Sequence, residues 1–177
     1  AKESINALRS LASTYDPGSR SLDGCGALFP SGTLELLASF QLIPGLDPDV
    51  TSRCEETTRL LSSDLSTSAM IDPLEGGIFN SRVGSSWWLP RFNLDCPALA
   101  RSTIALLTTY RANGNPMLLK QSLAAIAYSE KHFITREGLF SLGGQQKFKT
   151  EDWLWSIEEL EKALTADELK VISTISD

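Results

Sequence analysis

Apolar residues recur at helical spacing in five segments of the chain, and turn-forming residues separate these segments. Apolar positions three or four residues apart lie on one face of an α-helix, and Ser, Asp, Asn, Pro and Gly mark helix ends. The pattern predicts helices that follow Ser4, Ser31, Asp47, Asp95 and Asn115. We therefore expect an all-α fold.

The clearest local feature is a pair of neighbouring helices on either side of Asn113-Gly114. Glycine suits the end of a helix, and Asn115-Pro116 is a favourable start for the next one. A connection this short makes the two helices antiparallel. In the second helix, over about 116–133, we expect the buried stripe to consist of Leu119, Leu123, Ile126 and Phe133.

Residues 134–155 lose the helical period. Two short extended pieces are expected there, at 138–140 and 147–149, around Gly143-Gly144. Ser156 with Glu159, and Thr165 with Glu168, have the spacing of capping boxes and predict two short C-terminal helices. Their buried residues are expected to be Leu160, Leu164, Leu169 and Ile172.

Between the third and fourth helices lies the long connection at 72–95, DPLEGGIFNSRVGSSWWLPRFNLD. Long irregular connections in a helical protein often carry function. Gly26, Gly77 and Gly138 each follow a helix, at intervals of about two helices. This weak repeat favours stacked helical hairpins, in an open solenoid or a closed toroid whose loops gather at one end. An irregular bundle is the alternative.

Composition narrows the class of protein. The chain has 177 residues, of which 42% are hydrophobic, so we expect one domain over 1–177 with a sizeable core. Sixteen basic and 22 acidic residues give a net charge of -6, which argues against nucleic-acid binding. No apolar run reaches the roughly 20 residues of a membrane span. The chain does not start with Met, and we expect it to be a segment of a longer protein.

The three cysteines, Cys25, Cys54 and Cys96, are odd in number and far apart in the sequence. They favour free thiols in a reducing, cytoplasmic compartment over disulfides or a zinc site. No metal cluster is expected. The sequence also has no phosphate-binding loop or dinucleotide motif, so we expect no cofactor.

Carboxylates near the aromatic loops are the candidates for catalysis, because glycoside hydrolysis uses two facing carboxyl groups. His132 is the single histidine and cannot by itself supply a paired acid and base. Asp72 suits a turn and Asp95 suits a helix cap, whereas Glu75 has no structural explanation in the sequence. The catalytic candidates are Glu75, Asp95 and Asp152.

Paired tryptophans could provide stacking surfaces for a sugar ring, and arginines could donate hydrogen bonds to it. We expect one tryptophan of each pair to be core, and the apolar neighbours of Trp88 and Trp155 favour these two. The ligand-binding candidates are therefore Arg82, Trp87, Arg91 and Trp153.

Several short motifs occur in an order that resembles a known family. They are GGIF at 76–79, WWLPRF at 87–92, YRANGNP at 110–116, GLFS at 138–141 and WLWSIEEL at 153–160. The order resembles the helical, six-hairpin-glycosidase-like portion of the thioredoxin-domain-fused proteins, over about residues 16–164. The resemblance implies an α/α toroid similar to that of N-acylglucosamine 2-epimerases, and a carbohydrate-related role.

The chain also departs from that family. The family loop W-x-x-P-H-F-E-K-M has its histidine, glutamate and lysine replaced here by Arg91, Asn93 and Leu94. The acidic Asp-Ala-Asp cluster that follows the Gly-Phe-Tyr-Ser turn in the family is missing, and the thioredoxin-like part is absent. Six hairpins exceed the length of 177 residues, so the resemblance implies a partial or reduced toroid.

Two functions follow as predictions. The first is a carbohydrate-related module that binds a sugar with little or no catalysis. The second is a structural or protein-interaction domain, whose exposed edge is covered by a second copy or by the missing thioredoxin-like and toroid segments. Whether the chain is an enzyme stays open at this point.

Overall fold

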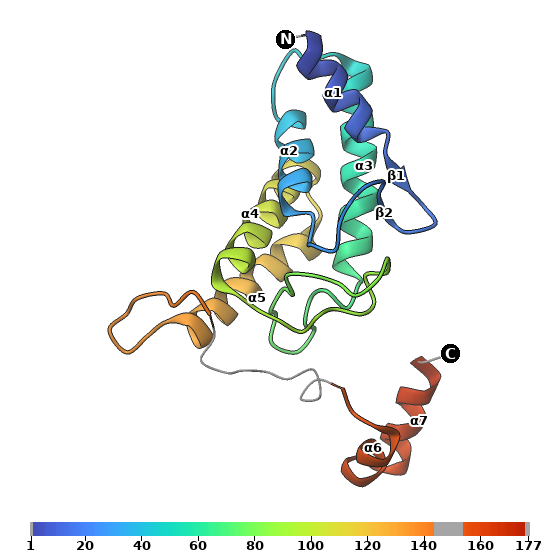
Figure 1. The fold of residues 1–177 in the computed structure, drawn as a ribbon, viewed down its shortest axis with the longest axis vertical. Helices are drawn as coiled ribbons and strands as arrows, with labels where there is room; N and C mark the ends of the chain where they lie inside the picture. The colour runs from blue at the N-terminus through green and yellow to red at the C-terminus, as the bar shows by residue number, and fades with distance from the viewer. Residues whose placement is uncertain (1, 144–153, 176–177) are drawn as a thin grey trace. The chain divides into compact units, whose positions relative to one another are not determined.

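The computed structural model describes residues 2–143 and 154–175 of the chain (Figure 1). The chain forms two compact units, Ala1–Gln146 and Lys147–Asp177. Helices dominate both units, and the single sheet within the described ranges has two strands of two residues each. The predicted all-α class is confirmed.

The described part of the larger unit contains five helices and a small antiparallel hairpin. The helices are α1 (Lys2–Ala12), α2 (Ser31–Gln41), α3 (Pro48–Ser66), α4 (Cys96–Asn113) and α5 (Pro116–Phe133). The hairpin pairs β1 (Tyr15–Asp16) with β2 (Ser21–Leu22). It follows α1 directly, so the chain turns back before it enters α2 (Figure 1).

The predicted starts of α3, α4 and α5 are confirmed, and each has a side-chain cap followed by a proline in the first turn. Asp47 Oδ1 accepts the Asp49 amide at 2.9 Å, and Asp95 Oδ1 accepts the Ala98 amide at 2.8 Å. Such caps satisfy amides that have no partner within the helix. Gly114 ends α4 with a φ of 71°, a conformation that glycine adopts without a steric cost.

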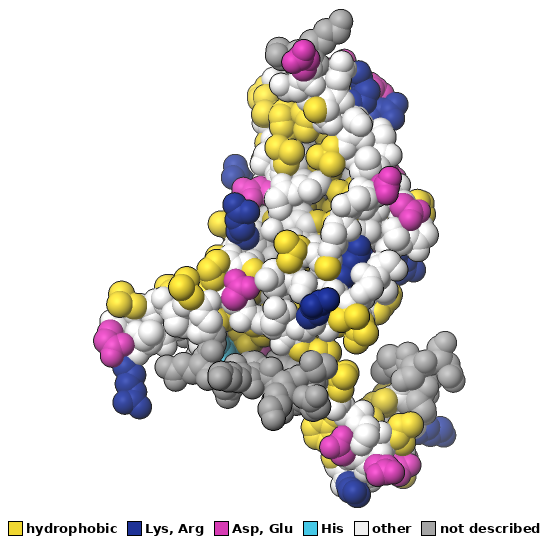
Figure 2. Space-filling view, viewed as in Figure 1, with side chains coloured by type: hydrophobic (Ala, Val, Ile, Leu, Met, Phe, Trp, Pro, Cys, Tyr) yellow, Lys and Arg dark blue, Asp and Glu magenta, His cyan; other side chains and the backbone are white. Residues whose placement is uncertain are grey.

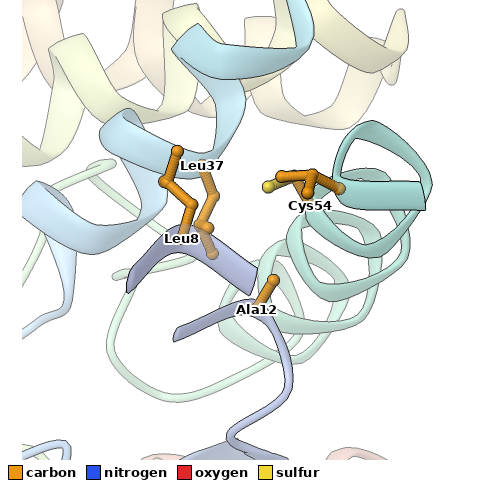
Figure 3. Close-up of a cluster of buried hydrophobic side chains, with 5 residues drawn as sticks. Leu8, Ala12, Leu37 and Cys54 are labelled. Atoms are coloured by element: carbon orange, nitrogen blue, oxygen red, sulfur yellow. The ribbon is translucent and has the colours of Figure 1, made fainter. Parts of the chain in front are cut away.

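The helices pack as two hairpins, α2 with α3 and α4 with α5, and α2 of the first hairpin packs on α4 of the second. The leucines between them are fully buried; they include Leu34, Leu61, Leu65, Leu99, Leu106 and Leu118. Helix α1 closes one end of the first hairpin, where Leu8 and Ala12 pack against Leu37 and Cys54 (Figure 3). Cys54 is buried there, as expected for a structural thiol.

The predicted buried stripe of α5 is confirmed only for Phe133, and Leu119 is partly buried. Leu118 and Tyr128 are buried instead, whereas Leu123 is 56% exposed and Ile126 is 40% exposed. Apolar residues occur on several faces of α5, so spacing alone could not select one. The buried face is the one on which α5 packs against α4, and the connection at 76–77 packs beside it at Ala124 and Tyr128.

The connection at 72–95 is folded rather than open. The Phe79 amide donates to the Met70 carbonyl at 2.8 Å, which closes the segment into a narrow loop. The Phe29 amide donates to the Asn80 carbonyl and the Arg82 amide to the Ala27 carbonyl, each at 2.8 Å. The loop before α2 and the connection before α4 are thus joined by backbone hydrogen bonds, and this layer shapes the site described below.

The smaller unit contains α6 (Ile157–Ala163) and α7 (Ala166–Ile175). Both predicted capping boxes are confirmed, with Ser156 bonded to Glu159 and Thr165 bonded to Glu168. The residues expected to be buried are only partly so, since Leu160, Leu164 and Leu169 are half-buried and Ile172 is 37% exposed. A pair of short helices has too little interior to enclose them.

The first predicted extended piece is present as an isolated bridge between Ile134 and Phe140. The Ser141 amide also donates to the Phe133 carbonyl at 2.8 Å, which returns the chain toward the end of α5. The second piece, at 147–149, lies outside the described residues.

Candidate functional site

The larger unit has a cleft of about 320 Å³ where three segments meet. The turn between β1 and β2, the end of α3, and the tip of the 72–95 connection each contribute side chains. The lining residues are Gly18, Ser19, Arg20, Asp64, Ser68, Ser85, Ser86, Trp87 and Trp88. Four serines, one arginine and one carboxylate make most of these groups hydrogen-bonding ones, and two indoles supply the apolar surface.

Trp87 connects two of the segments that form the cleft. Its side chain is only 3% exposed, and its Nε1 donates to the Arg20 carbonyl at 2.9 Å. The Arg82 guanidinium carbon lies 3.7 Å from the centroid of the Trp87 ring, in a cation–π contact. The expectation that Trp87 offers an open stacking surface is wrong, because the indole is buried between the 72–95 connection and the β1–β2 turn, to which it donates its hydrogen bond.

Trp88 has the exposed ring instead. It lines the cleft and is 58% exposed, which contradicts the prediction that it belongs to the core. Trp155, the other tryptophan expected in the core, is 60% exposed. An indole is buried where its N–H finds an acceptor, and Trp87 finds one on a turn that lies 67 residues away in the sequence. Neighbouring residues in the sequence carry no information about that acceptor.

Arg82 lies behind the cleft and is 4% exposed. Its Nη1 donates to the Ser85 carbonyl at 2.5 Å and its Nη2 to the Cys25 carbonyl at 3.3 Å. Its Nε has no partner among the described residues. Burial lowers the pKa of Arg82, but arginine stays cationic at neutral pH. Arg82 was expected to donate to a ligand directly, but it is buried and both of its Nη atoms donate to the protein backbone.

Tyr15 and Asp64 form a pair beside the cleft, with 2.5 Å between the Tyr15 hydroxyl and Asp64 Oδ2. Burial and then the Asp64 carboxylate raise the pKa of Tyr15 to about 12. Tyr15 therefore keeps its proton at neutral pH and serves as the donor to Asp64. One oxygen of Asp64, the single acidic side chain among the described lining residues, is thus occupied.

Arg20 has a backbone φ of 51°, in the left-handed region. This conformation costs a residue with a Cβ about 1–2 kcal/mol. The Trp87 hydrogen bond to its carbonyl helps hold it there. The residue is exposed and lines the cleft.

Glu75 is explained by a contact outside the cleft. Its carboxylate accepts a hydrogen bond from Lys131, and Oε2 lies 3.0 Å from His132 Nε2, an ion-pair distance without hydrogen-bond alignment. The hydrogen bond from Lys131 is the main cause that lowers the pKa of Glu75. The His132 ring stacks on Tyr128 with 4.2 Å between centroids. Glu75 therefore anchors the connection to α5.

The remaining candidates also lie away from the cleft lining. Asp95 caps α4 and accepts Asn80 Nδ2 at 3.0 Å, as its helix-cap interpretation predicted. Arg91 is exposed, and its backbone amide donates to the Ser81 carbonyl at 2.8 Å. Asp152 and Trp153 lie outside the described residues. Of the candidates within the described ranges, only Trp87 lines the cleft.

Sequence reasoning missed most of the lining, including Arg20, Asp64 and the serines. Asp64 lies on α3 among other polar residues, and the serines are scattered over three segments. Arg20 has a left-handed backbone conformation in the turn between β1 and β2, and no sequence pattern predicts this conformation for an arginine. The missed residues could be found only after the three segments had been brought together.

No family model matches the chain, and no curated protein is significantly similar to it. In the described part of the chain, no His, Cys, Asp and Glu side chains form a group of three that could hold a metal. None of the described helices has the length and apolar character needed to cross a membrane.

Proposed function

We propose that this chain is a carbohydrate-binding module and that a sugar lies in the cleft against Trp88. The observation that carries the proposal is an exposed indole beside four serine hydroxyls, one guanidinium and one carboxylate. The apolar face of a sugar ring stacks on an aromatic side chain while its hydroxyls bond to polar neighbours. The cleft volume, about 320 Å³, is at the small end of ligand sites and suits a ligand of mono- or disaccharide size.

The lining favours binding without hydrolysis. Two facing carboxyl groups are needed to protonate a leaving group and to activate water or attack the sugar. Asp64 is the one carboxylate among the described lining residues, and Tyr15 occupies one of its oxygens. Glu75 and Asp95 are held by Lys131 and by the start of α4.

The helical architecture is compatible with the resemblance to six-hairpin toroids. Two antiparallel helical hairpins pack side by side in the larger unit, which is the packing mode of such a toroid. We propose that the chain represents part of an α/α toroid related to the thioredoxin-domain-fused proteins. We also propose that it binds a sugar without the proton-transferring loop residues of that family.

Calorimetric titration of the full chain with a panel of neutral and charged oligosaccharides tests the binding proposal. We expect saturable binding that weakens about tenfold or more in Trp88→Ala, because the stacking surface is removed. Trp155→Ala is the matched control, since Trp155 is 60% exposed and does not line the cleft. Equal affinities in wild type and Trp88→Ala, or no binding of any sugar, would refute the proposal.

An interaction domain is the second candidate, because α4 and α5 expose large apolar side chains. Ile104 is 50%, Leu123 is 56% and Ile126 is 40% exposed. Leu123 and Ile126 are three residues apart and share one face of α5. Figure 2 shows hydrophobic side chains on the visible surface of the larger unit, in the region of α4. Helical hairpins ordinarily bury such a face against the next hairpin.

Sedimentation of the wild-type chain and of Leu123→Glu distinguishes this candidate. If a second copy covers the α4–α5 face, the wild type forms a dimer and the variant is a monomer. A wild-type chain that stays monomeric at high concentration contradicts self-association through this face. Glu56→Gln, on an exposed part of α3, is the control for an unrelated surface change.

A further inference from the structure

Two guanidinium groups and two carboxylates belong to the segments that form the cleft, and Arg20 and Asp64 line it. Arg20 lines it with an exposed side chain, and Arg82 is buried directly against the Trp87 ring. Asp64 also lines it, and Asp16 lies in the same turn as Arg20. The two positive and two negative groups balance in number. The hydrogen bonds that each group already makes therefore decide which of them can still bind a ligand.

Both carboxylates already have donors from the protein. Asp64 accepts from the Tyr15 hydroxyl at 2.5 Å. Asp16 accepts the backbone amides of Gly18 and Ser19 at 2.9 and 3.1 Å, and these bonds lower its pKa. Hydrogen bonds to a carboxylate stabilise its charged form and leave fewer lone pairs for other donors.

The guanidinium groups have fewer of their hydrogen-bonding positions occupied. Neither Arg20 nor Arg82 makes an ion pair with a carboxylate of the described residues. Arg82 is 4% exposed, bonds only to neutral carbonyls and leaves Nε without a described partner. A buried cation is costly unless an anion is near. Asp64 and Asp16 keep their negative charge, but the guanidinium donors have the most hydrogen-bonding capacity left for a ligand.

We propose that the ligand of the cleft is an acidic saccharide, a sugar ring that carries a carboxylate. The inference rests on the proposed sugar site. The ring lies on Trp88 and the carboxylate pairs with the Arg20 guanidinium, whose planar fork matches two carboxylate oxygens. The left-handed backbone of Arg20 is held by the Trp87 bond to its carbonyl, so the point from which this side chain extends is fixed before binding. Arg82 contributes a positive potential from behind the Trp87 ring.

Trigalacturonate and its methyl ester are suitable probes, because they share one sugar skeleton and differ in charge. We expect the full chain to bind trigalacturonate about tenfold or more tightly than the ester, the effect of one charge-assisted contact. Arg20→Ala should remove this difference and retain the affinity for the ester. Arg91→Ala is the control, because Arg91 is exposed and does not line the cleft.

A salt titration of the wild type supplies a test that needs no variant. The affinity for trigalacturonate should fall with rising NaCl while that for the ester should change little, because salt screens the ion pair. Several outcomes overturn the inference. Equal affinity for both probes, lost in Trp88→Ala, would reject the acidic ligand and retain the sugar site. Binding of neither probe would reject both proposals. Inorganic sulfate that competes as well as trigalacturonate would indicate a simple anion site without sugar recognition.

Discussion

Replacing Gly76 by alanine should destabilise the larger unit strongly. Gly76 has a φ of +85°, and a Cβ added there would lie 2.5 Å from the Ala124 Cβ and 2.9 Å from the Ala124 carbonyl carbon. The backbone conformation costs about 1–2 kcal/mol for a residue with a side chain. Overpacking against a helix backbone costs about 1–3 kcal/mol more. We expect Gly76→Ala to lower the free energy of unfolding by about 2–5 kcal/mol, a large part of the stability of a typical domain.

The two costs can be separated with a matched control. Gly84 has a φ of +69°, but a Cβ there would meet nothing within 4 Å. Gly84→Ala should therefore show only the backbone cost. Both variants are measured by urea denaturation, followed by circular dichroism and tryptophan fluorescence, and compared through their midpoints at constant slope. Equal destabilisation of the two variants would refute the close packing of Gly76 on α5.

A second variant tests the contact itself. Ala124→Gly removes the Cβ that lies 2.5 Å away but leaves the backbone carbon at 2.9 Å. On its own it should cost about 1 kcal/mol in helix propensity. In the Gly76→Ala background it should recover part of the lost stability, which a double-mutant cycle isolates. Additive effects would contradict the contact.

Further predictions concern the helices and the Glu75 anchor. Leu118→Ala should cost about 2–5 kcal/mol and Leu123→Ala less than about 0.5 kcal/mol in chemical denaturation, because only Leu118 is fully buried; the reverse order would restore the stripe predicted from sequence. Asp95→Ala should cost about 1–2 kcal/mol through loss of the α4 cap, as measured by thermal unfolding, and an unchanged midpoint would contradict that role. Lys131 lowers the pKa of Glu75 below its usual 4.5, so this pair stabilises the fold above that pH and the benefit is lost as pH falls through the folded pKa. The stability difference between wild type and Glu75→Gln should shrink in acid, and a difference that grows there would refute the pairing.

The amino-acid sequence by itself determined where three of the long helices start, whereas α1 begins at Lys2, before the predicted Ser4. Asp47, Asp95 and Asn115, each followed by proline in the first turn, start α3, α4 and α5 through bonds to amides two or three residues ahead. Such contacts are local, so the residue types and their spacing are sufficient to predict them. The same holds for the capping boxes at Ser156 and Thr165. The fold class follows from these local signals.

Only the tertiary structure decided which faces are buried and where the candidate site lies. Trp87 is buried and Trp88 exposed because the Arg20 carbonyl, 67 residues away in the sequence, accepts the Trp87 N–H. The buried face of α5 was likewise decided by its packing against α4. Contacts between distant segments depend on how whole helices and loops pack, and no local pattern encodes them. For the same reason the cleft lined by Asp64 could not be predicted from the sequence, because three separate segments form it.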